Sequence, residues 1–305
     1  MRQGGLGARP RTETVGRHAA PLDQLDGEAM TTALIESQGT ALAALRAAQT
    51  QIDRAIAMAA SVMRRSGSRL IYCGAGTSGR IALLDAVELK PTFNWPDERL
   101  EVLLAGGAQS FYEAQEGAED DGASARAALI ALDVSANDVV VGLAASGTTP
   151  YVLQAMETAR ERAATTIGLA NNPGAPLLSM VDCPVLLDTG PEILAGSTRL
   201  TAGTSQKIAL NTFSTGLMVR LGRVYKGYMV DMRATNAKLR VRAVTIVSDI
   251  AGCDDDAAQA ALDATGYDIK RAVLVAAGAT PDMAARLLGE VDGNLGAALT
   301  RLAGA

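Results

Sequence analysis

A loop rich in glycine and hydroxyl side chains is the segment of this sequence best suited to chemistry. It reads Cys73-Gly-Ala-Gly-Thr-Ser-Gly-Arg80 and stands between an apolar run typical of a strand and a helical pattern. Glycines let a backbone approach a ligand closely, and the first turn of a helix offers unpaired N–H groups and a partial positive charge. The loop therefore predicts an anion site that includes Gly76, Thr77, Ser78 and Gly79.

The spacing Gly74-x-Gly76-x-x-Gly79 also matches the fingerprint of a dinucleotide site. That interpretation needs an acidic residue at the end of the next strand, and the run 101–105 continues instead into Gly106-Gly107. A second hydroxyl loop, Ser146-Gly147-Thr148-Thr149, follows the apolar run 138–143 and precedes another helical pattern. Two such loops at one sheet edge fit a phosphate monoester, whose oxygens accept several hydrogen bonds at once. Two ordinary N-capped turns are the alternative.

A third cluster, Gly196-Ser197-Thr198-Arg199, stands between the last apolar run and a long helical pattern. It would add two hydroxyls and the guanidinium of Arg199 to the same edge. A plain capping turn explains this cluster equally well.

Acid–base chemistry would have to use carboxylates, lysine or tyrosine, because the only histidine, His18, lies in a polar leader. The lone histidine also excludes a His-rich zinc site. Glu88 stands near the end of the helical pattern that follows the first loop, next to Pro91, which stops helices. Glu119 lies between the second apolar run and the helical pattern after it. Taken alone, each glutamate is better explained as a solvated surface residue.

Five apolar runs alternate with helical patterns and would position these loops. The runs are 69–73, 101–105, 138–143, 165–170 and 183–187, and the helical patterns between them lie near 78–87, 123–132, 150–161 and 175–180. This alternation predicts an α/β fold with a doubly wound, five-stranded parallel sheet flanked by helices. Ligands of such sheets bind beyond the carboxyl ends of the strands, where the loops are expected.

Further helical patterns lie on both sides of this region, at 30–66 before it and at 202–221 and 229–247 after it. From Asp254 the composition becomes acidic and rich in alanine. Two segments there repeat weakly at an offset of 27 residues, since Asp255 and Gly266 match Asp282 and Gly293. We expect a small bundle of short helices, which serves packing or dimer formation more readily than the binding of a separate ligand.

Composition narrows the class of protein further. The 305 residues carry a formal charge of −5, which leaves no basic surface to hold nucleic acid by counterion release. Three scattered cysteines without a CxxC pair favour a reducing cytoplasm over a disulfide framework. No apolar run is long enough to span a membrane, and the first eleven residues lack the apolar core of a secretory signal.

The order of short motifs along the chain resembles the N-acetylmuramic acid 6-phosphate etherase family of sugar-isomerase-domain proteins. The motifs are 74–80, 84–88 with Pro91-Thr92, 105–107, 116–120, 145–147 with 149–151, 190–192, 196–199, 202–204, Gln206-Lys207, 229–231 and 234–237. The resemblance covers nearly the whole chain at closely preserved spacing, from Thr12-Glu13 through the C-terminal helices.

This resemblance implies a reaction without a metal or redox cofactor. The lactyl ether at C3 of N-acetylmuramate 6-phosphate would be cleaved to N-acetylglucosamine 6-phosphate and D-lactate, by elimination and then hydration. Matching the family's motifs implies that Glu88 is the proton donor and Glu119 the second catalytic carboxylate, the likelier base. The phosphate would lie against Thr77, Ser78, Ser146 and Thr148 or Thr149.

Three departures from the family's motifs affect the expected site. Leu89-Lys90-Pro91 stands where the family often has Cys-Pro-Pro, Thr148 replaces a usual arginine, and Val15-Gly16 replaces the leading Arg-Asn of an N-terminal motif. In addition, a straight helix would carry Glu88 about 15 Å from Ser78 along its axis. Either the helix ends early or bends, or Glu88 serves the loop of a neighbouring subunit, and the family's fold implies a homodimer with shared active sites.

The expected organisation is an N-terminal arm at 1–29, a sugar isomerase domain at 30–245 and a small, UBA-like helical domain at 246–305. Two other functions remain open on this fold. One is a non-catalytic sugar-phosphate-binding regulator, since regulatory proteins contain the same domain. The other is an aldose–ketose isomerase, which would also use a glutamate base but would release no lactate.

Overall fold

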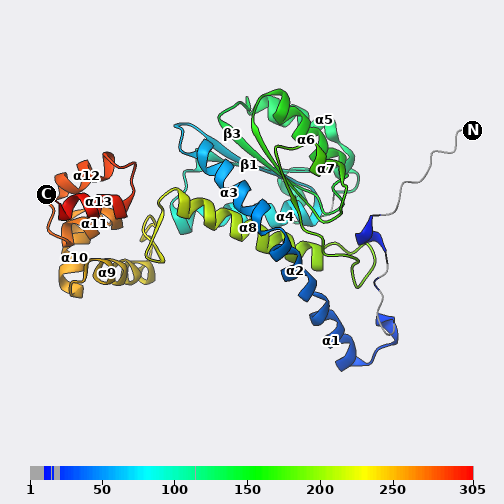
Figure 1. The fold of residues 1–305 in the computed structure, drawn as a ribbon, viewed down its shortest axis with the longest axis horizontal. Coiled ribbons are helices and arrows are strands. Elements are labelled where there is room, and N and C mark those ends of the chain that lie inside the picture. Colours follow the sequence, from blue (N-terminus) through cyan, green and yellow to red (C-terminus); the bar gives the residue numbers. More distant parts are fainter. Residues whose placement is uncertain (1–9, 15, 17–20, 114, 305) are drawn as a thin grey trace, which may run out of the picture. The chain divides into compact units, whose positions relative to one another are not determined.

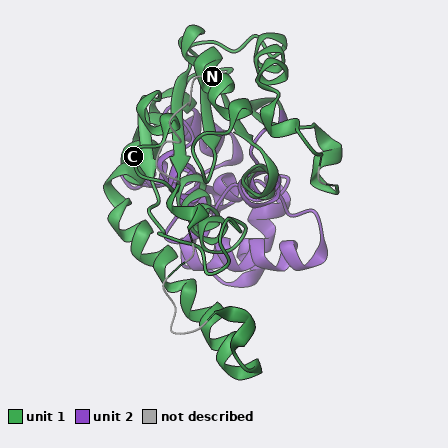
Figure 2. Ribbon diagram, turned by 90° about the vertical axis from the view of Figure 1, so that its right-hand side faces the viewer, with its two compact units in different colours: residues 1–86, 98–214 green, residues 87–97, 215–305 purple. Residues whose placement is uncertain are grey.

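The structure is a computed structural model that describes residues 10–14, 16, 21–113 and 115–304. Val15 and His18, which the sequence analysis singled out, and residues 1–9 of the expected arm lie outside the described residues. The chain divides into two compact units, shown in Figure 2. The first is Met1–Ala86 with Glu98–Ser214, and the second is Val87–Asp97 with Thr215–Ala305.

The first unit contains a parallel sheet in the order β2-β1-β3-β4-β5. Its strands are β1 (Arg69–Gly74), β2 (Leu100–Leu104), β3 (Asp138–Leu143), β4 (Thr165–Ala170) and β5 (Cys183–Leu186). All six residues of β3 are buried, as expected of a central strand with helices on both faces. The predicted five-stranded parallel sheet is confirmed.

Helices cover both faces of this sheet (Figure 1). On one face lie α5 (Gly122–Ala131), α6 (Pro150–Glu161) and α7 (Pro176–Ser179), and on the other lie α3 (Gln49–Met63), α4 (Gly76–Phe93) and α8 (Thr201–Arg220). Side chains of β1 alternate between the two faces. Cys73 belongs to the core formed with α5 and α6, whereas Tyr72 bonds to Asp85 of α4. The doubly wound α/β architecture is therefore confirmed.

Shorter elements complete the first unit. The predicted helical stretch at 30–66 forms three helices, α1 (Gly27–Ser37), α2 (Gly39–Ala47) and α3. Single-turn 3₁₀ helices are η1 (Arg11–Glu13), η2 (Leu22–Gln24), η4 (Ala108–Phe111) and η5 (Ala118–Asp120), and η3 (Asp97–Arg99) lies where the two units meet in the sequence.

The second unit is a bundle of short helices, as predicted. It contains the hairpin of β6 (Val224–Tyr225) and β7 (Tyr228–Met229), followed by α9 (Ala237–Ala251), α10 (Asp255–Ala264), α11 (Ile269–Ala276), α12 (Pro281–Gly289) and α13 (Leu295–Ala303). The sequence repeat corresponds to the pairs α10–α11 and α12–α13. Gly266 and Gly293, the matching glycines of the two pairs, have φ of 63° and 73°, which favours glycine at both turns.

The helix predicted at 229–247 is wrong in its first part. Gly227, with φ of 82°, makes the turn that places Met229 in the hairpin. Helix α9 begins only after Asn236, whose side chain accepts the N–H of Leu239 and so fixes the helix start. The expected domain boundary after residue 245 falls inside α9, and the second compact unit begins at Thr215 and takes in Val87–Asp97. Independent folding of the expected domains stays a prediction.

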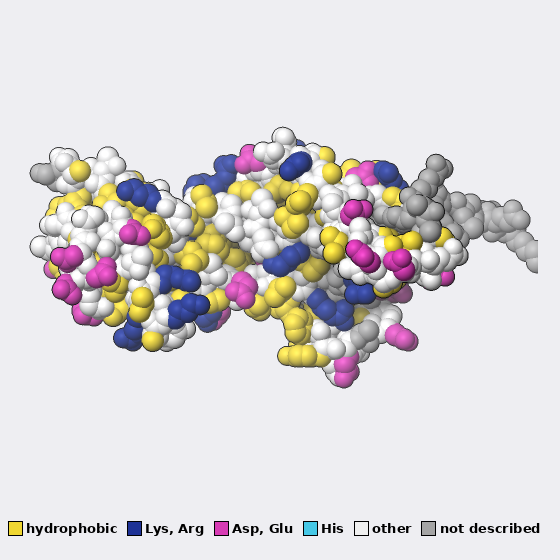
Figure 3. Space-filling view, turned by 90° about the horizontal axis from the view of Figure 1, so that it is seen from below, with side chains coloured by type: hydrophobic (Ala, Val, Ile, Leu, Met, Phe, Trp, Pro, Cys, Tyr) yellow, Lys and Arg dark blue, Asp and Glu magenta, His cyan; other side chains and the backbone are white. Residues whose placement is uncertain are grey.

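Charged side chains are mixed over the face of the molecule drawn in Figure 3. Lys and Arg, Asp and Glu, and apolar side chains are all exposed on that face. This distribution agrees with the net charge of −5.

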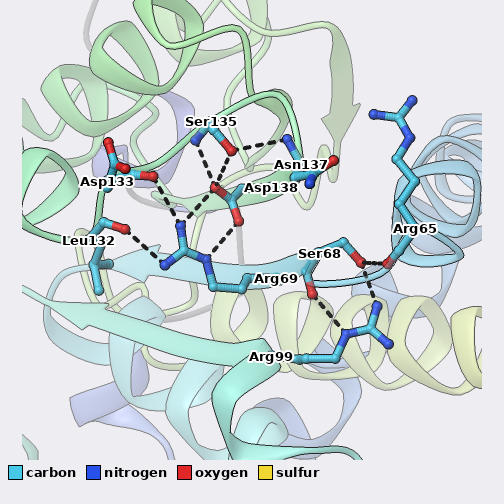
Figure 4. Close-up of polar contacts among 9 residues, drawn as sticks. All are labelled: Arg65, Ser68, Arg69, Arg99, Leu132, Asp133, Ser135, Asn137 and Asp138. Atoms are coloured by element: carbon cyan, nitrogen blue, oxygen red, sulfur yellow. Dashed lines mark hydrogen bonds and ion pairs between the residues drawn. The ribbon is translucent and has the colours of Figure 1, made fainter.

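An ion-paired cluster joins β1 and β3 at their amino ends (Figure 4). Arg69 donates from Nε and Nη2 to the two carboxylate oxygens of Asp138, at 2.8 and 2.9 Å, and from Nη1 to the carbonyl of Leu132. The Ser135 N–H donates to the same carboxylate at 2.7 Å. Asp138 is only 1% exposed, so this carboxylate depends on these donors for the solvation that it loses on folding.

Replacing Asp138 with asparagine is expected to lower the free energy of unfolding by about 3 kcal/mol, because it leaves the Arg69 guanidinium without its charged partner. Urea denaturation followed by circular dichroism measures this change. Asp133→Asn is the matched control, because Asp133 is exposed and its 3.8 Å ion pair with Arg162 contributes little to the free energy of unfolding. The backbone φ of 47° at this position also suits asparagine. Equal denaturation midpoints for the two variants would contradict the prediction.

Candidate phosphate and acid–base site

The first hydroxyl loop lies where β1 passes into α4, and its glycines are required by close backbone contact. A Cβ on Gly74 would lie 2.8 Å from the Cα of Gly79, and a Cβ on Gly79 would collide with Leu104. Gly76 has φ of 50°, which side chains other than glycine rarely adopt. The start of α4 is thereby held against the end of the strand, as an anion site at a helix N-terminus needs.

The hydroxyls of this loop are not engaged by the protein. Ser78 is 8% exposed and Thr77 is half-buried. Within the described residues, neither hydroxyl takes part in a hydrogen bond. Both side chains are therefore free to donate to an anion placed at the first turn of α4.

The second loop lies between β3 and α6. Gly147 has φ of 68°, and a Cβ there would collide with Ala175. Ser146 accepts the N–H of Thr148 at 3.2 Å. Thr149 occupies the N-cap position of α6, but its side chain makes no capping bond. An ordinary N-cap therefore does not explain the Thr149 hydroxyl.

The sheet brings these two loops side by side. Strands β1 and β3 pair in parallel, with Gly74 opposite Leu143, so both chains leave the sheet at the same edge. The strand order reverses between these two strands. Open α/β sheets bind ligands outside the carboxyl ends of the strands at such a reversal. The structure thus brings together 76–79 and 146–149.

The third predicted loop adjoins the first. A Cβ on Gly203 of α8 would lie 3.2 Å from the Thr198 carbonyl oxygen and 3.5 Å from the Thr77 Cγ2. Ser197 and Thr198 are half-buried, and Arg199 is exposed. The residues 196–199 therefore lie next to the first loop, on the same side of the sheet.

The capping of α8 is performed by a residue that the sequence analysis did not single out as a cap. Glu192 is fully buried, and its carboxylate accepts the N–H groups of Thr201 at 3.0 Å and Ala202 at 2.8 Å. The carbonyls of Ser197 and Thr198 accept the N–H groups of Leu200 and Gly203, so the cluster also forms the turn that leads into α8, and its part in a ligand site stays a prediction. The motif 190–192 is recognisable in the sequence, but no local pattern indicates that the Glu192 side chain caps a helix that begins nine residues later.

The two candidate acids lie on different elements. Glu119 is exposed on η5, which begins after Gly117, a residue with φ of 74°. Glu88 is exposed on α4 and belongs to the segment Val87–Asp97 of the second unit. Helix α4 is continuous from Gly76 to Phe93, with Pro91 inside it. The alternative in which the helix ends early is thus wrong, and Glu88 lies about 15 Å from Ser78 along the axis.

A buried carboxylate missed by the sequence analysis joins α4 to β1 and α8. Asp85 is 2% exposed and accepts from the Tyr72 hydroxyl at 2.9 Å, from Asn211 Nδ2 at 3.1 Å and from the Ser214 hydroxyl at 3.1 Å. Burial raises the pKa of Asp85, while these hydrogen bonds and the charge of Lys207 act in the opposite direction. The network fixes the orientation of the helix whose first turn belongs to the first hydroxyl loop.

Cys73 directly precedes the first loop but is not a nucleophile. It is fully buried, and burial raises the pKa of its thiol to about 12. At pH 8 the thiol is therefore almost wholly protonated, and the thiolate is the reactive form.

Native protein treated with iodoacetamide at pH 8 is expected to be alkylated at Cys253, which is half-exposed, long before Cys73 reacts. Mass spectrometry of tryptic peptides at successive times measures the two rates. Alkylation in urea is the control, because unfolding should make Cys73 react at a rate close to that of Cys253. Early modification of Cys73 in native protein would show that the loop opens.

No group of three or more His, Cys, Asp or Glu in the described part of the chain is arranged to hold a metal ion. None of the described helices is both long enough and apolar enough to cross a bilayer.

Comparison with known proteins agrees with this geometry. Residues 51–160 match the glucokinase regulatory protein N-terminal SIS domain, and residues 121–215 match the SIS domain. With the five-stranded sheet and its paired loops, these matches define the chain as an SIS domain protein.

Full-length relatives give the family. The chain is 54% identical to an N-acetylmuramic acid 6-phosphate etherase of Deinococcus radiodurans over 87% of each chain. It is 48% identical to one of Serratia proteamaculans, over 82% of this chain and 84% of that one, and 44% identical to one of Streptomyces avermitilis, over 94% and 93%. The chain belongs to the N-acetylmuramic acid 6-phosphate etherase family, as its motif order predicted.

Proposed function

We propose that this protein cleaves the lactyl ether at C3 of N-acetylmuramate 6-phosphate and gives N-acetylglucosamine 6-phosphate and D-lactate. The observation that carries the proposal is the pair of hydroxyl loops at the reversal of strand order, in a chain of this family. Among the described residues, the hydroxyls of Thr77, Ser78 and Thr149 take part in no hydrogen bond, and a phosphate monoester can accept from several of them at once.

The reaction follows from the acidity of the open-chain sugar. Ring opening exposes an aldehyde at C1, which acidifies the proton on C2. A base removes the C2 proton, and the C3–O bond breaks as the lactate oxygen takes up a proton from an acid. Water then adds across the C2=C3 double bond, so that the C3 hydroxyl oxygen comes from solvent and C2 regains a proton. Overall, one water is consumed and one lactate is released.

In this scheme Glu119 is the base and Glu88 is the proton donor. The phosphate, bound by Thr77, Ser78, Ser146 and Thr148 or Thr149, fixes one end of the flexible open chain. This converts the encounter of C2 and C3 with the carboxylates into a step within one complex. Ser197, Thr198 and Arg199 complete the loop edge, and Arg199 adds a cation to it, whereas the second loop has Thr148 in place of the family's usual arginine.

The active site is completed by a second copy of the chain. Glu88 lies about 15 Å along α4 from the Ser78 of its own chain, which is further than one hexose phosphate extends. A homodimer that places Glu88 at the loops of the partner subunit removes this difficulty. The same dimer would bury the Glu88 carboxyl, which is exposed in the single chain. Burial favours the protonated form of a carboxyl group, which is the form that a general acid needs. The free thiols and the sugar-phosphate substrate suit a protein of the cytoplasm.

An assay for D-lactate, with N-acetylmuramate 6-phosphate and purified protein in ¹⁸O-labelled water, tests the proposal. We expect lactate without label and N-acetylglucosamine 6-phosphate with one ¹⁸O at C3. Label in the lactate hydroxyl would mean direct hydrolysis on the lactyl side and would overturn the elimination. Binding of the sugar phosphate without lactate would favour a regulator, which the match to a regulatory protein's SIS domain keeps as the second candidate.

A further inference from the structure

The N-terminal turn η1 is built into the wall of the candidate site. Thr12 is fully buried. Its N–H donates to the Oδ1 of Asn172 at 3.3 Å, and its hydroxyl accepts from Asn172 Nδ2 at 3.0 Å. The same Nδ2 donates to the carbonyl of Ala145 at 2.9 Å, one residue before the Ser146 loop. Through Asn172, a residue near the start of the chain is therefore fixed against the second phosphate loop.

A second set of bonds fixes η1 to the third loop. The N–H of Gly196 donates to the carbonyl of Thr12 at 2.9 Å, and Arg11 pairs with Asp188 at 2.7 Å. The turn Arg11–Glu13 thus lies between the loops 146–149 and 196–199, although about 180 residues of chain separate it from the latter. These anchors come from three separate segments, so the position of the turn is well defined.

Glu13 projects from this turn to the backbone of the third loop. One of its carboxylate oxygens lies 2.9 Å from the point where a Cβ on Gly196 would stand, so any larger residue at 196 would displace it. The Glu13 side chain is exposed, and within the described residues its carboxylate accepts no hydrogen bond from the protein, so it is open to a ligand. Gly196 lies two residues before Thr198 in the sequence. The Thr198 carbonyl and the Thr77 side chain both lie close to Gly203 of α8. The third loop therefore connects Glu13, through at most about 7 Å of chain between Gly196 and Thr198, to the neighbourhood of the first loop.

The charge of Glu13 decides which part of a ligand it can meet. A carboxylate repels a phosphate at short range, and it accepts hydrogen bonds but donates none when ionised. On a phosphorylated amino sugar, the matching donors are the hydroxyls and the acetamido N–H. These groups lie along the carbon chain, away from the phosphate that the hydroxyl loops hold.

We propose that Glu13 is a sugar-recognition residue of this site, whose carboxylate accepts hydrogen bonds from the hydroxyl or acetamido N–H groups of the substrate. The proposal rests on the proposed function and adds a residue to its binding site. Thr12 is the positioning residue, because its buried backbone and hydroxyl hold the turn in place.

Isothermal titration of the full chain with two probes, N-acetylglucosamine 6-phosphate and inorganic phosphate, tests this role. For Glu13→Ala we expect about tenfold weaker binding of the sugar phosphate, the loss typical of one charged hydrogen bond, and unchanged binding of inorganic phosphate. Glu13→Gln keeps an acceptor oxygen and should lose less than Glu13→Ala. In turnover with N-acetylmuramate 6-phosphate, KM should rise while kcat stays within about twofold, because a binding contact acts on ground and transition states alike.

Glu157→Ala is the matched control, since Glu157 is an exposed glutamate on α6 and should leave both affinities unchanged. Equal affinity of wild-type protein and Glu13→Ala for the sugar phosphate would overturn the proposal. An equal loss for both probes would also overturn it, since Glu13 would then only shape the phosphate loops. If the wild-type protein binds inorganic phosphate but not the sugar phosphate, the proposed function itself fails, and that result is distinct from the other two.

Discussion

Glu119→Gln is expected to lower kcat for lactate release by about a thousandfold and to stop exchange of the C2 proton with solvent. Glutamine keeps the shape of the side chain and cannot take up the proton from C2, so the first step fails. The measurement is lactate release together with nuclear magnetic resonance of substrate incubated in D₂O.

Glu88→Gln distinguishes the role of the proton donor from that of the base. It should also lose about a thousandfold in lactate release, because the leaving oxygen receives no proton, but the base is intact and the C2 proton should still exchange. Asp120→Asn, beside Glu119 on the same exposed turn, serves as the control and should keep most of the activity. Turnover like that of wild type by Glu88→Gln would refute its assignment as donor, and identical exchange by both glutamine variants would show that the roles are not divided as proposed.

N-Acetylmuramate without its phosphate is expected to react with a kcat/KM about 10⁴-fold below that of the phosphorylated substrate. Three or more hydrogen bonds to a doubly charged group, at about 2 kcal/mol each, account for a loss of this size. Coupled assay of lactate at several concentrations of each substrate gives the ratio.

A substitution of Ser78 tests whether the first loop accounts for this ratio of kcat/KM values. Ser78→Ala should lower kcat/KM for the phosphorylated substrate by about tenfold or more and leave the slow reaction of N-acetylmuramate unchanged, because only the phosphate uses that hydroxyl. Ser61→Ala, which removes an exposed hydroxyl from α3, is the control and should change neither rate. If Ser78→Ala slowed both substrates equally, Ser78 would support the fold of the loop rather than bind phosphate.

The sheet and its loops could be predicted because their signals are local. The strands at 138–143 and 165–170 were located to the residue, since buried parallel strands are short apolar runs bounded by turn residues. The loop 74–80 was found because the close contact of Gly74 with Gly79 and the hydroxyls of Thr77 and Ser78 leave a characteristic composition.

What could not be predicted depends on contacts between distant segments. The cap of α8 by Glu192 and the bonds of Thr12 to Asn172 and Gly196 join residues that no local pattern relates. The hydrogen-bond network of Asp85 spans β1, α4 and α8, and a lone aspartate in a helix gives no sign of it. The segment 229–236 was predicted as the start of a helix, although Met229 belongs to the hairpin and α9 begins only at Ala237.

The pairing of Arg69 with Asp138 has a consequence for how this protein tolerates change. Strands of six residues separate that pairing from the loops 76–79 and 146–149, a span of about 20 Å. We therefore expect substitutions at the amino ends of the strands to act on thermal resistance, and substitutions at the carboxyl ends to act on substrate turnover. On this expectation, heat-tolerant variants could be selected at the amino ends while the chemistry at the other ends stays unchanged.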